Sequence, residues 1–200
     1  MKRVLVAHAT FAGSTPEVAQ AIAGVLDQEG FSAQVASLQE VSSLEGYDAL
    51  ILGAPMILGW HRRARGFLRR HRRALERIPF AVFVTAMSLT QTGDRELDRV
   101  PVHLDPKLPR PPARVGRLSL RERYATVANY GRPILKAARP ARPVSLAFFA
   151  GRLDYGRLQW WAVVFAMVLV RAQAGDRRNW DDIRAWAQGV AAGFKAAAAA

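Results

Sequence analysis

The chain has 200 residues, and its 50% hydrophobic content is enough for one well-buried domain. It contains no cysteine, which excludes disulfides, thiolate metal sites, iron–sulfur clusters and a cysteine nucleophile. The chain has 29 basic residues, all but four of them arginine, and 16 acidic residues, which gives a formal net charge of +13. This charge either favours an anionic partner or reflects an arginine-rich composition that selects no particular partner.

The first half of the chain alternates apolar runs with helical patterns. Residues 4–7 are an apolar run, and apolar residues at helical spacing follow until Gly30. Ala33 and Val35 alternate with polar neighbours as in an edge strand, and residues 49–52 form a second apolar run. A helix pattern then extends from Trp60 to Ile78 and leads into an apolar strand at residues 80–84. The predicted order is therefore strand, helix, strand, strand, helix, strand.

At the start of the second half, the alternation of strand and helix patterns is interrupted. Residues 90–118 carry five prolines and no periodicity, which predicts a long loop insertion. A helix near 120–135, a last strand at 144–149, an apolar run at 160–170 and a final helix near 180–194 follow. Five strands alternating with helices predict an α/β fold with a parallel sheet covered on both faces. We expect one domain over residues 1–195 and an alanine tail at 196–200.

The bend after the first strand is the first candidate site. In an open parallel sheet, ligands bind beyond the carboxyl ends of the strands, and the loop after the first strand is the usual place. We interpret Thr15 as a helix N-cap with Pro16 at the first helical position, so backbone N–H groups and the helix dipole face the loop. The predicted phosphate-binding residues are Thr10, Phe11, Ala12, Gly13, Ser14 and Thr15.

The same loop lacks the lysine of a nucleoside triphosphate site. Neither GxxxxGK[ST] nor GxGxxG occurs there, and neutral hydroxyl donors suit a single terminal phosphate monoester, as in flavin mononucleotide (FMN). The pattern T-x-x-G-x-T after a strand, followed by Ala19-Gln20-Ala21-Ile22, resembles the flavodoxin signature, with His8 where flavodoxins usually carry Tyr or Phe. The resemblance implies a flavodoxin-like five-stranded parallel sheet of order 2-1-3-4-5 that binds FMN.

Two further loops hold the flavin ring in flavodoxins. Gly59 matches the glycine whose peptide lies beside the reactive edge of the ring, while Ile57 and Leu58 stand where many flavodoxins place an aromatic residue. Trp60 either faces the ring or packs in the core as the start of its helix. The ring-binding residues that the resemblance implies are Ala54, Pro55, Met56, Ile57, Leu58, Gly59, Trp60, Ala86, Met87 and Ser88.

Within that superfamily, the chain most resembles the quinone-dependent protoporphyrinogen dehydrogenases. The stretches that carry this resemblance are LGAPMILGWHRRARGFLRRHRRAL, FFAGRLDYGRLQWWAVVFAMVLVRAQAG and NWDDIRAWAQGVA. The insertion at 90–118 and a short segment between Gly175 and Trp180 depart from that group. The resemblance implies an FMN-dependent enzyme of haem biosynthesis that dehydrogenates protoporphyrinogen IX and passes electrons to a quinone. The flavin would carry the chemistry, so we assign no catalytic side chain and no metal site.

Two features predict contact with a membrane surface. His61 to Arg73 contains seven arginines in thirteen residues, a cationic helix face that either attracts anionic lipid or is simply solvated. Residues 160–170 are uncharged, but as a helix they span about 16 Å against roughly 30 Å of hydrocarbon. Because this helix would be apolar on all sides, its surface must be buried against a membrane, a second subunit, the insertion or the core of the domain. Without a secretory signal at Met1, we expect a cytoplasmic protein on the inner face of the plasma membrane.

Two other classes of function stay open. One is a flavodoxin-like electron carrier or a nicotinamide-fed quinone reductase, although soluble carriers of this fold tend to be acidic and this chain has a pI near 11.3. The other is a basic binding module that has lost the flavin. We expect no nucleic-acid binding, because no aromatic residues for base stacking are interleaved with the arginine run.

Overall fold

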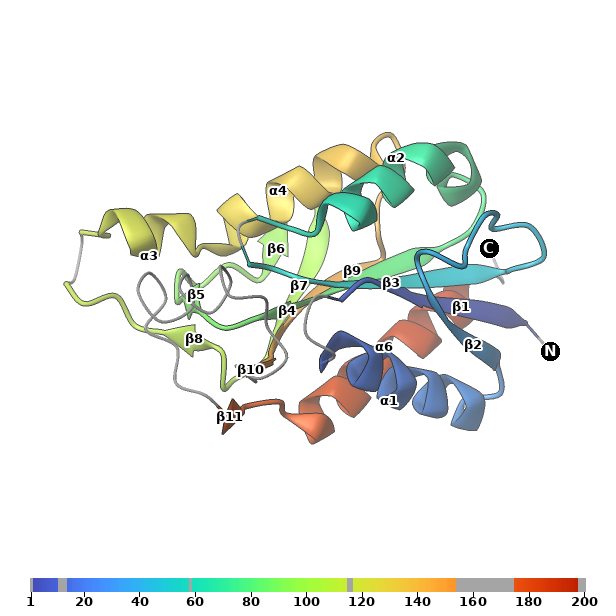
Figure 1. The fold of residues 1–200 in the computed structure, drawn as a ribbon, viewed down its shortest axis with the longest axis horizontal. Helices are drawn as coiled ribbons and strands as arrows, with labels where there is room; N and C mark the ends of the chain where they lie inside the picture. The colour runs from blue at the N-terminus through green and yellow to red at the C-terminus, as the bar shows by residue number, and fades with distance from the viewer. Residues whose placement is uncertain (1, 11–13, 58, 115–116, 154–174, 198–200) are drawn as a thin grey trace.

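The computed structural model describes residues 2–10, 14–57, 59–114, 117–153 and 175–197. Its centre is a seven-stranded sheet of order β2-β1-β3-β4-β9-β7-β6 (Figure 1). The first five positions in that order are parallel strands: β2 (Ser32–Ser37), β1 (Arg3–His8), β3 (Ala49–Pro55), β4 (Phe80–Ala86) and β9 (Ser145–Ala150). The predicted α/β fold and its strand order 2-1-3-4-5 are confirmed.

The central strands are buried on both faces. Every residue of β3 and β4 is buried, which is why their sequences are continuous apolar runs and do not alternate with polar residues. Gly53 in β3 is needed for this packing, because a Cβ atom there would lie 1.9 Å from Cζ of Phe83. The glycine leaves the space that the neighbouring phenylalanine ring fills.

Two helical layers cover the sheet, and Figure 1 shows them on opposite faces. The helices α1 (Ser14–Gln28) and α6 (Trp180–Ala197) lie on one face, where a core cluster joins them to strand residues such as Val4 and Phe83. The helices α2 (Arg62–Leu75) and α4 (Val127–Ala138) lie on the other face, over a second cluster that includes Leu52 and Val84. Both layers follow from right-handed crossovers between parallel strands.

The helix predicted near 120–135 is two helices. The short helix α3 (Leu120–Tyr124) begins after Ser119, which forms a capping box with Glu122. A second cap follows at Thr126, whose hydroxyl accepts a hydrogen bond from the Asn129 N–H at 3.2 Å and starts α4. Side chains that satisfy helix N-termini thus divide a stretch that periodicity alone presents as continuous.

The insertion is not the structureless loop that its prolines predicted. It contains β5 (Leu89–Thr90), β6 (Glu96–Leu97), β7 (Val100–Leu104) and β8 (Pro109–Arg110). β7 pairs parallel with β9 and antiparallel with β6, so the insertion extends the sheet by two strands. Val100 and Val102 are buried while Pro101 between them is exposed, an alternation that signals a strand despite the proline.

A buried carboxylate fastens this insertion to the sheet. Asp105 is fully buried; its Oδ2 accepts a hydrogen bond from the Ala150 N–H at 2.9 Å, and its own N–H donates to the Phe148 carbonyl at 3.0 Å. Two residues earlier, His103 Nε2 lies 2.8 Å from Asp182 Oδ2 on α6. These polar contacts hold the end of β7 against β9 and α6.

The C-terminal part differs from prediction at its end. α6 extends to Ala197, so two residues of the expected alanine tail are helical. Ahead of it, β10 (Arg152–Leu153) pairs antiparallel with β11 (Gly175–Asp176). The apolar run at 160–170 lies outside the described residues. Among the helices that are described, none is long and apolar enough to cross a membrane.

Candidate functional site

Three loops meet at the carboxyl edge of the sheet. Because β1, β3 and β4 are parallel neighbours, the loops that follow them leave from the same edge. Backbone hydrogen bonds hold their starting points together: the Ala9 N–H donates to the Gly53 carbonyl and the Met56 N–H donates to the Thr85 carbonyl, both at 2.9 Å. The edge is therefore a rigid frame for whatever the loops bind.

The first loop brings its hydroxyls to the start of α1. Thr10 is exposed, Ser14 is half-buried at the first residue of the helix, and Thr15 is completely buried. Phe11, Ala12 and Gly13 lie outside the described residues. Thr15 is not the expected N-cap: it lies inside α1, and its hydroxyl contacts a side chain of β4, whereas a cap would contact the backbone of its own helix.

The partner of Thr15 is Thr85, at the end of β4. Their hydroxyl oxygens lie 3.2 Å apart, and both side chains are buried. A hydroxyl–hydroxyl bond uses only one of the two hydroxyl protons, so one O–H of the pair can still donate to an acceptor. Together with the Ser14 hydroxyl and the N-terminal N–H groups of α1, the pair is a neutral donor set that suits a phosphate monoester.

The loop after β3 contains a glycine, Gly59, that leaves space for a ligand. Ala54, Pro55 and Met56 are buried, and Met56 forms an isolated antiparallel bridge with Trp60 that closes the loop. Gly59 has φ +95°, a conformation that side chains disfavour, and no atom lies within 4 Å of the position that its Cβ would occupy. The Cα of Gly59 thus faces open space. Ile57 is half-buried beside it, and Leu58 lies outside the described residues.

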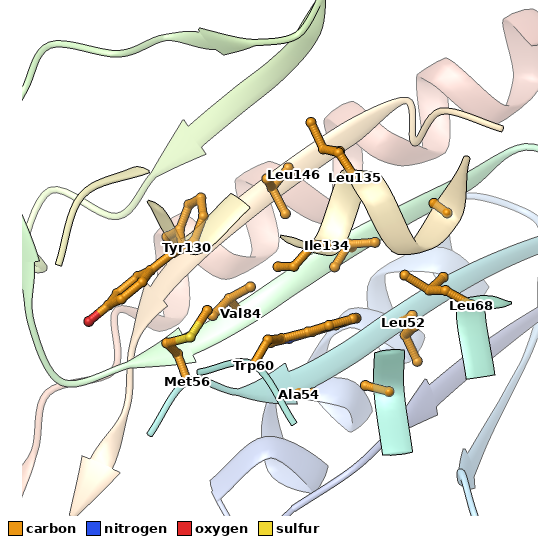
Figure 2. Close-up of a cluster of buried hydrophobic side chains, with 14 of the residues drawn as sticks. Leu52, Ala54, Met56, Trp60, Leu68, Val84, Tyr130, Ile134, Leu135 and Leu146 are labelled. Carbon is orange, nitrogen blue, oxygen red and sulfur yellow. The ribbon is translucent and has the colours of Figure 1, made fainter. Parts of the chain in front are cut away.

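Trp60 packs in the core. Its side chain is 3% exposed and lies among residues of β3, β4 and α4, including Leu52, Val84 and Ile134 (Figure 2). Its indole Nε1 is buried and has no hydrogen-bond partner among the described residues. Of the two roles open from sequence, packing is the one seen, and a stacking role requires the ring to become exposed.

The fourth-strand loop continues the edge beside Tyr130. Ala86 is buried, whereas Met87 and Ser88 are half-buried. Burial raises the pKa of the Tyr130 phenol to about 12, with Tyr124 adding to the rise and a hydrogen bond with the Ser88 side chain opposing it. This phenol stays protonated at neutral pH and keeps a donor next to the loop.

Two histidines border the same edge, and both are held neutral. Burial is the main reason that the pKa of His8, at the end of β1, is lowered, and Glu40 opposes the shift. Burial also lowers the pKa of His61, helped by Arg63. Neutral imidazoles add no positive charge to this edge, so the hydrogen-bond donors described there, the hydroxyls and the N–H groups at the start of α1, are neutral.

Sequence reasoning missed an arginine at the first turn of α1. Arg178 is 8% exposed; it donates to Glu17 at 2.7 Å and to Asp176, and it stacks 4.4 Å from the Trp180 ring centroid. These contacts raise the pKa of Arg178 and lower that of Asp176. Because Glu17 and Arg178 are 161 residues apart, no local pattern predicts the pair. It neutralises the only carboxylate in the first turn of α1 as described.

A family model for the flavodoxin domain matches residues 5–179, most of the chain. The chain belongs to the flavodoxin domain family. This flavodoxin domain places the protein among flavin-associated redox proteins, and it includes all three loops at the carboxyl edge. No curated protein sequence matches the chain at a significant level.

Solved flavodoxins resemble the domain at low identity. A point mutant of flavodoxin from Pseudomonas aeruginosa is 14% identical over 96% of this chain and 99% of that one, with a TM-score of 0.46. A mutant of Fusobacterium nucleatum flavodoxin, bound to FMN, is 14% identical over 78% and 79%, with a TM-score of 0.37. A short-chain flavodoxin associated with a non-canonical PDU microcompartment is 16% identical over 43% of this chain and 62% of its own, with a TM-score of 0.36.

Proposed function

We propose that this protein binds FMN at the carboxyl edge of the sheet, with its phosphate at the start of α1. The observation that carries the proposal is the contact between the Thr15 and Thr85 hydroxyls, which joins the first turn of α1 to the end of β4 and leaves one hydroxyl proton to donate. Ser14 and the helix N-terminus supply further neutral donors. The open space beside Gly59 is where the ring edge would lie, by analogy with the family.

We further propose that the protein is an enzyme, a quinone-linked dehydrogenase of a protoporphyrinogen-like substrate. FMN would supply the redox chemistry, taking hydrogen from the reduced substrate and passing electrons to the quinone. The chain's own residues would bind and orient the reactants, and its arginines can pair bidentately with the propionates of such a substrate. Support comes from the sequence resemblance and from the net charge of +13. We propose that the protein acts at the inner face of the plasma membrane.

One finding also favours a second function, in which the protein is an electron carrier and not an enzyme. The family match covers residues 5–179 and specifies a flavodoxin domain, the domain of small electron carriers. Turnover separates the two proposals: an enzyme oxidises protoporphyrinogen catalytically when a quinone is present, whereas a carrier only exchanges electrons with protein partners. Bleaching by NADPH alone would instead indicate a nicotinamide-fed reductase.

FMN titration of a loop variant tests the cofactor site. The double variant Ser14→Ala, Thr15→Ala removes two hydroxyl donors, and we expect FMN binding to weaken by about 2 kcal/mol or more, which is roughly thirty-fold in Kd. Ser43→Ala is a matched control, because Ser43 is an exposed hydroxyl whose contact is the Glu45 N–H. Equal FMN affinity in the loop variant and the wild type would overturn the phosphate placement.

A further inference from the structure

A second candidate site lies between α2 and α4, where Figure 1 shows the two helices side by side above the sheet. A groove of about 610 Å³ runs between them, a volume typical of small-molecule sites. Residues of α2, α4 and the end of α3 line it. They are Arg65, Arg69, Arg123, Thr126, Ala128, Asn129, Arg132, Pro133 and Lys136.

The charge of this groove is entirely positive. Five of the nine lining residues are cations, and the groove is lined by no carboxylate. None of the five side chains takes part in an ion pair within the described part of the chain, although ion pairs occur elsewhere in the fold, such as Lys195 with Glu29. Unpaired like charges that converge on one groove repel one another, and a bound anion would relieve that repulsion.

The neutral groups in the groove are already used by the fold. The Thr126 hydroxyl accepts from the Asn129 N–H and donates to the Arg123 carbonyl. The Asn129 side-chain amide donates to the Tyr124 carbonyl at 2.8 Å. The free donors of the groove are therefore the guanidinium and ammonium groups, which select for negative charge.

The spacing of the cations indicates how many anionic groups the groove can engage. Arg65 and Arg69 are four residues apart on α2, and Arg132 and Lys136 are four apart on α4, so each pair extends about 6 Å along its helix. One phosphate monoester carries at most about two negative charges, whereas five cations line the groove. Guanidinium groups bind phosphate oxygens in bidentate fashion. The geometry suits a ligand with phosphate groups in succession.

We propose that the groove between α2 and α4 binds a ligand carrying two or more phosphate groups, as a site separate from the flavin edge. The flavin phosphate lies at α1 in the proposed function, whereas this groove lies in the α2/α4 layer on the opposite face of the sheet. The proposal therefore stands whether or not FMN binds. Its ligand is either a soluble oligophosphate or the headgroup of a polyphosphorylated lipid, since both present the same chemistry.

Titration with inorganic tripolyphosphate tests the site, using two variants that lose the same charge. Arg65→Gln, Arg69→Gln removes the α2 side of the groove, whereas Arg63→Gln, Arg70→Gln removes two exposed arginines that do not line it. At 100° per residue, Arg63 and Arg70 lie on the other flank of α2. We expect the groove variant to weaken binding at least ten-fold, and the flank variant by less than three-fold.

Vesicles distinguish the two sources of phosphate. Sedimentation with phosphatidylcholine vesicles, with and without a bisphosphorylated phosphoinositide, is measured for the wild type and both variants. Binding to the phosphoinositide vesicles that the groove variant loses and the flank variant keeps identifies a lipid headgroup, and tripolyphosphate binding alone identifies a soluble ligand. Equal losses in the two variants, or binding to neither probe, would overturn the proposal.

Discussion

The α1/α6 layer and the α2/α4 layer cover the same sheet, but only the first pairs its cations with carboxylates. Arg178 lies 2.7 Å from Glu17 on α1, and Lys195 on α6 lies 2.8 Å from Glu29. Within the described chain, no residue of α2 or α4 forms an ion pair, although α2 alone carries seven arginines. Ion pairs in the α1/α6 layer thus contrast with unpaired charge over the opposite face of the sheet.

Net charge alone is therefore a poor guide to function here. The +13 belongs to the whole chain, yet at α1 the cations lie against carboxylates that they neutralise. In the α2/α4 layer they remain available to an outside anion. Ion pairs of the first kind connect distant segments of the fold, whereas unpaired cations of the second kind create a positive potential that attracts anions.

The largest expected effects concern the separate core cluster under each layer. Phe83 is fully buried on the α1/α6 face, with ring centroids of Phe149 and Trp186 at 6.3 and 6.4 Å. Phe83→Ala is expected to lower the free energy of unfolding by about 4 kcal/mol, through lost burial and a cavity. Leu68→Ala, on the α2 face, should cost about 3 kcal/mol in the same urea denaturation. A loss below about 1 kcal/mol at Phe83 would mean that the described core is wrong.

A smaller effect tests the ion pair at α1. Arg178→Met keeps a long side chain but leaves Glu17 and Asp176 without their cation, and we expect a loss of about 2 kcal/mol in unfolding free energy. Arg184→Met is the control, because Arg184 is exposed and pairs with Asp181 one turn away; its loss should stay within about 0.5 kcal/mol. Similar losses in both variants would remove the contrast between the layers.

The smallest expected effect is a pH dependence of the free energy of unfolding that differs between the two layers. Burial, with Arg70 adding to it, lowers the pKa of His71 on α2 below its usual 6.5. The unfolded chain therefore takes up the proton first, so the stability from neutral His71 is present above about pH 6.5 and is lost as the pH falls through the folded pKa. Thermal unfolding from about pH 7 to about pH 5 should show a weaker pH dependence in His71→Gln than in the wild type.

On the α1/α6 side, the stability contributed by Asp176 depends on pH in a lower range. The hydrogen bond from Arg178 lowers the pKa of Asp176 below its usual 3.8, so the stability from this carboxylate is lost only as the pH falls below that value. Asp176→Asn should therefore leave the profile between about pH 7 and about pH 5 unchanged. A His71→Gln profile that matches the wild type would contradict the lowered pKa of this half-buried histidine in the α2/α4 layer.

The sequence predicted the elements whose signals are local. The apolar runs at residues 49–52 and 80–84 correspond to buried β3 and β4, and the helical spacing from Trp60 corresponds to α2. β7 was missed because five prolines in the insertion outweighed the alternation of Val100 and Val102. A proline is tolerated there because its ring is exposed and β7 lies next to the sheet's edge, flanked on its outer side only by the two-residue strand β6.

The candidate site was only partly predictable for a related reason. The loop after β1 shows its glycine and hydroxyls directly in the sequence, but Thr15 meets Thr85 across 70 residues. Arg178 meets Glu17 across 161 residues, and the groove of the α2/α4 layer combines three helices. Such contacts arise from the packing of distant elements, which local patterns do not encode.

The most direct test of the flavin site is the visible absorption spectrum of the purified protein after it is mixed with FMN and desalted. The proposed function predicts retained flavin absorption in the blue and near ultraviolet, close to one FMN per chain, and reduced retention in Ser14→Ala, Thr15→Ala. A folded protein that emerges colourless after FMN addition would contradict the proposal that this domain holds a flavin.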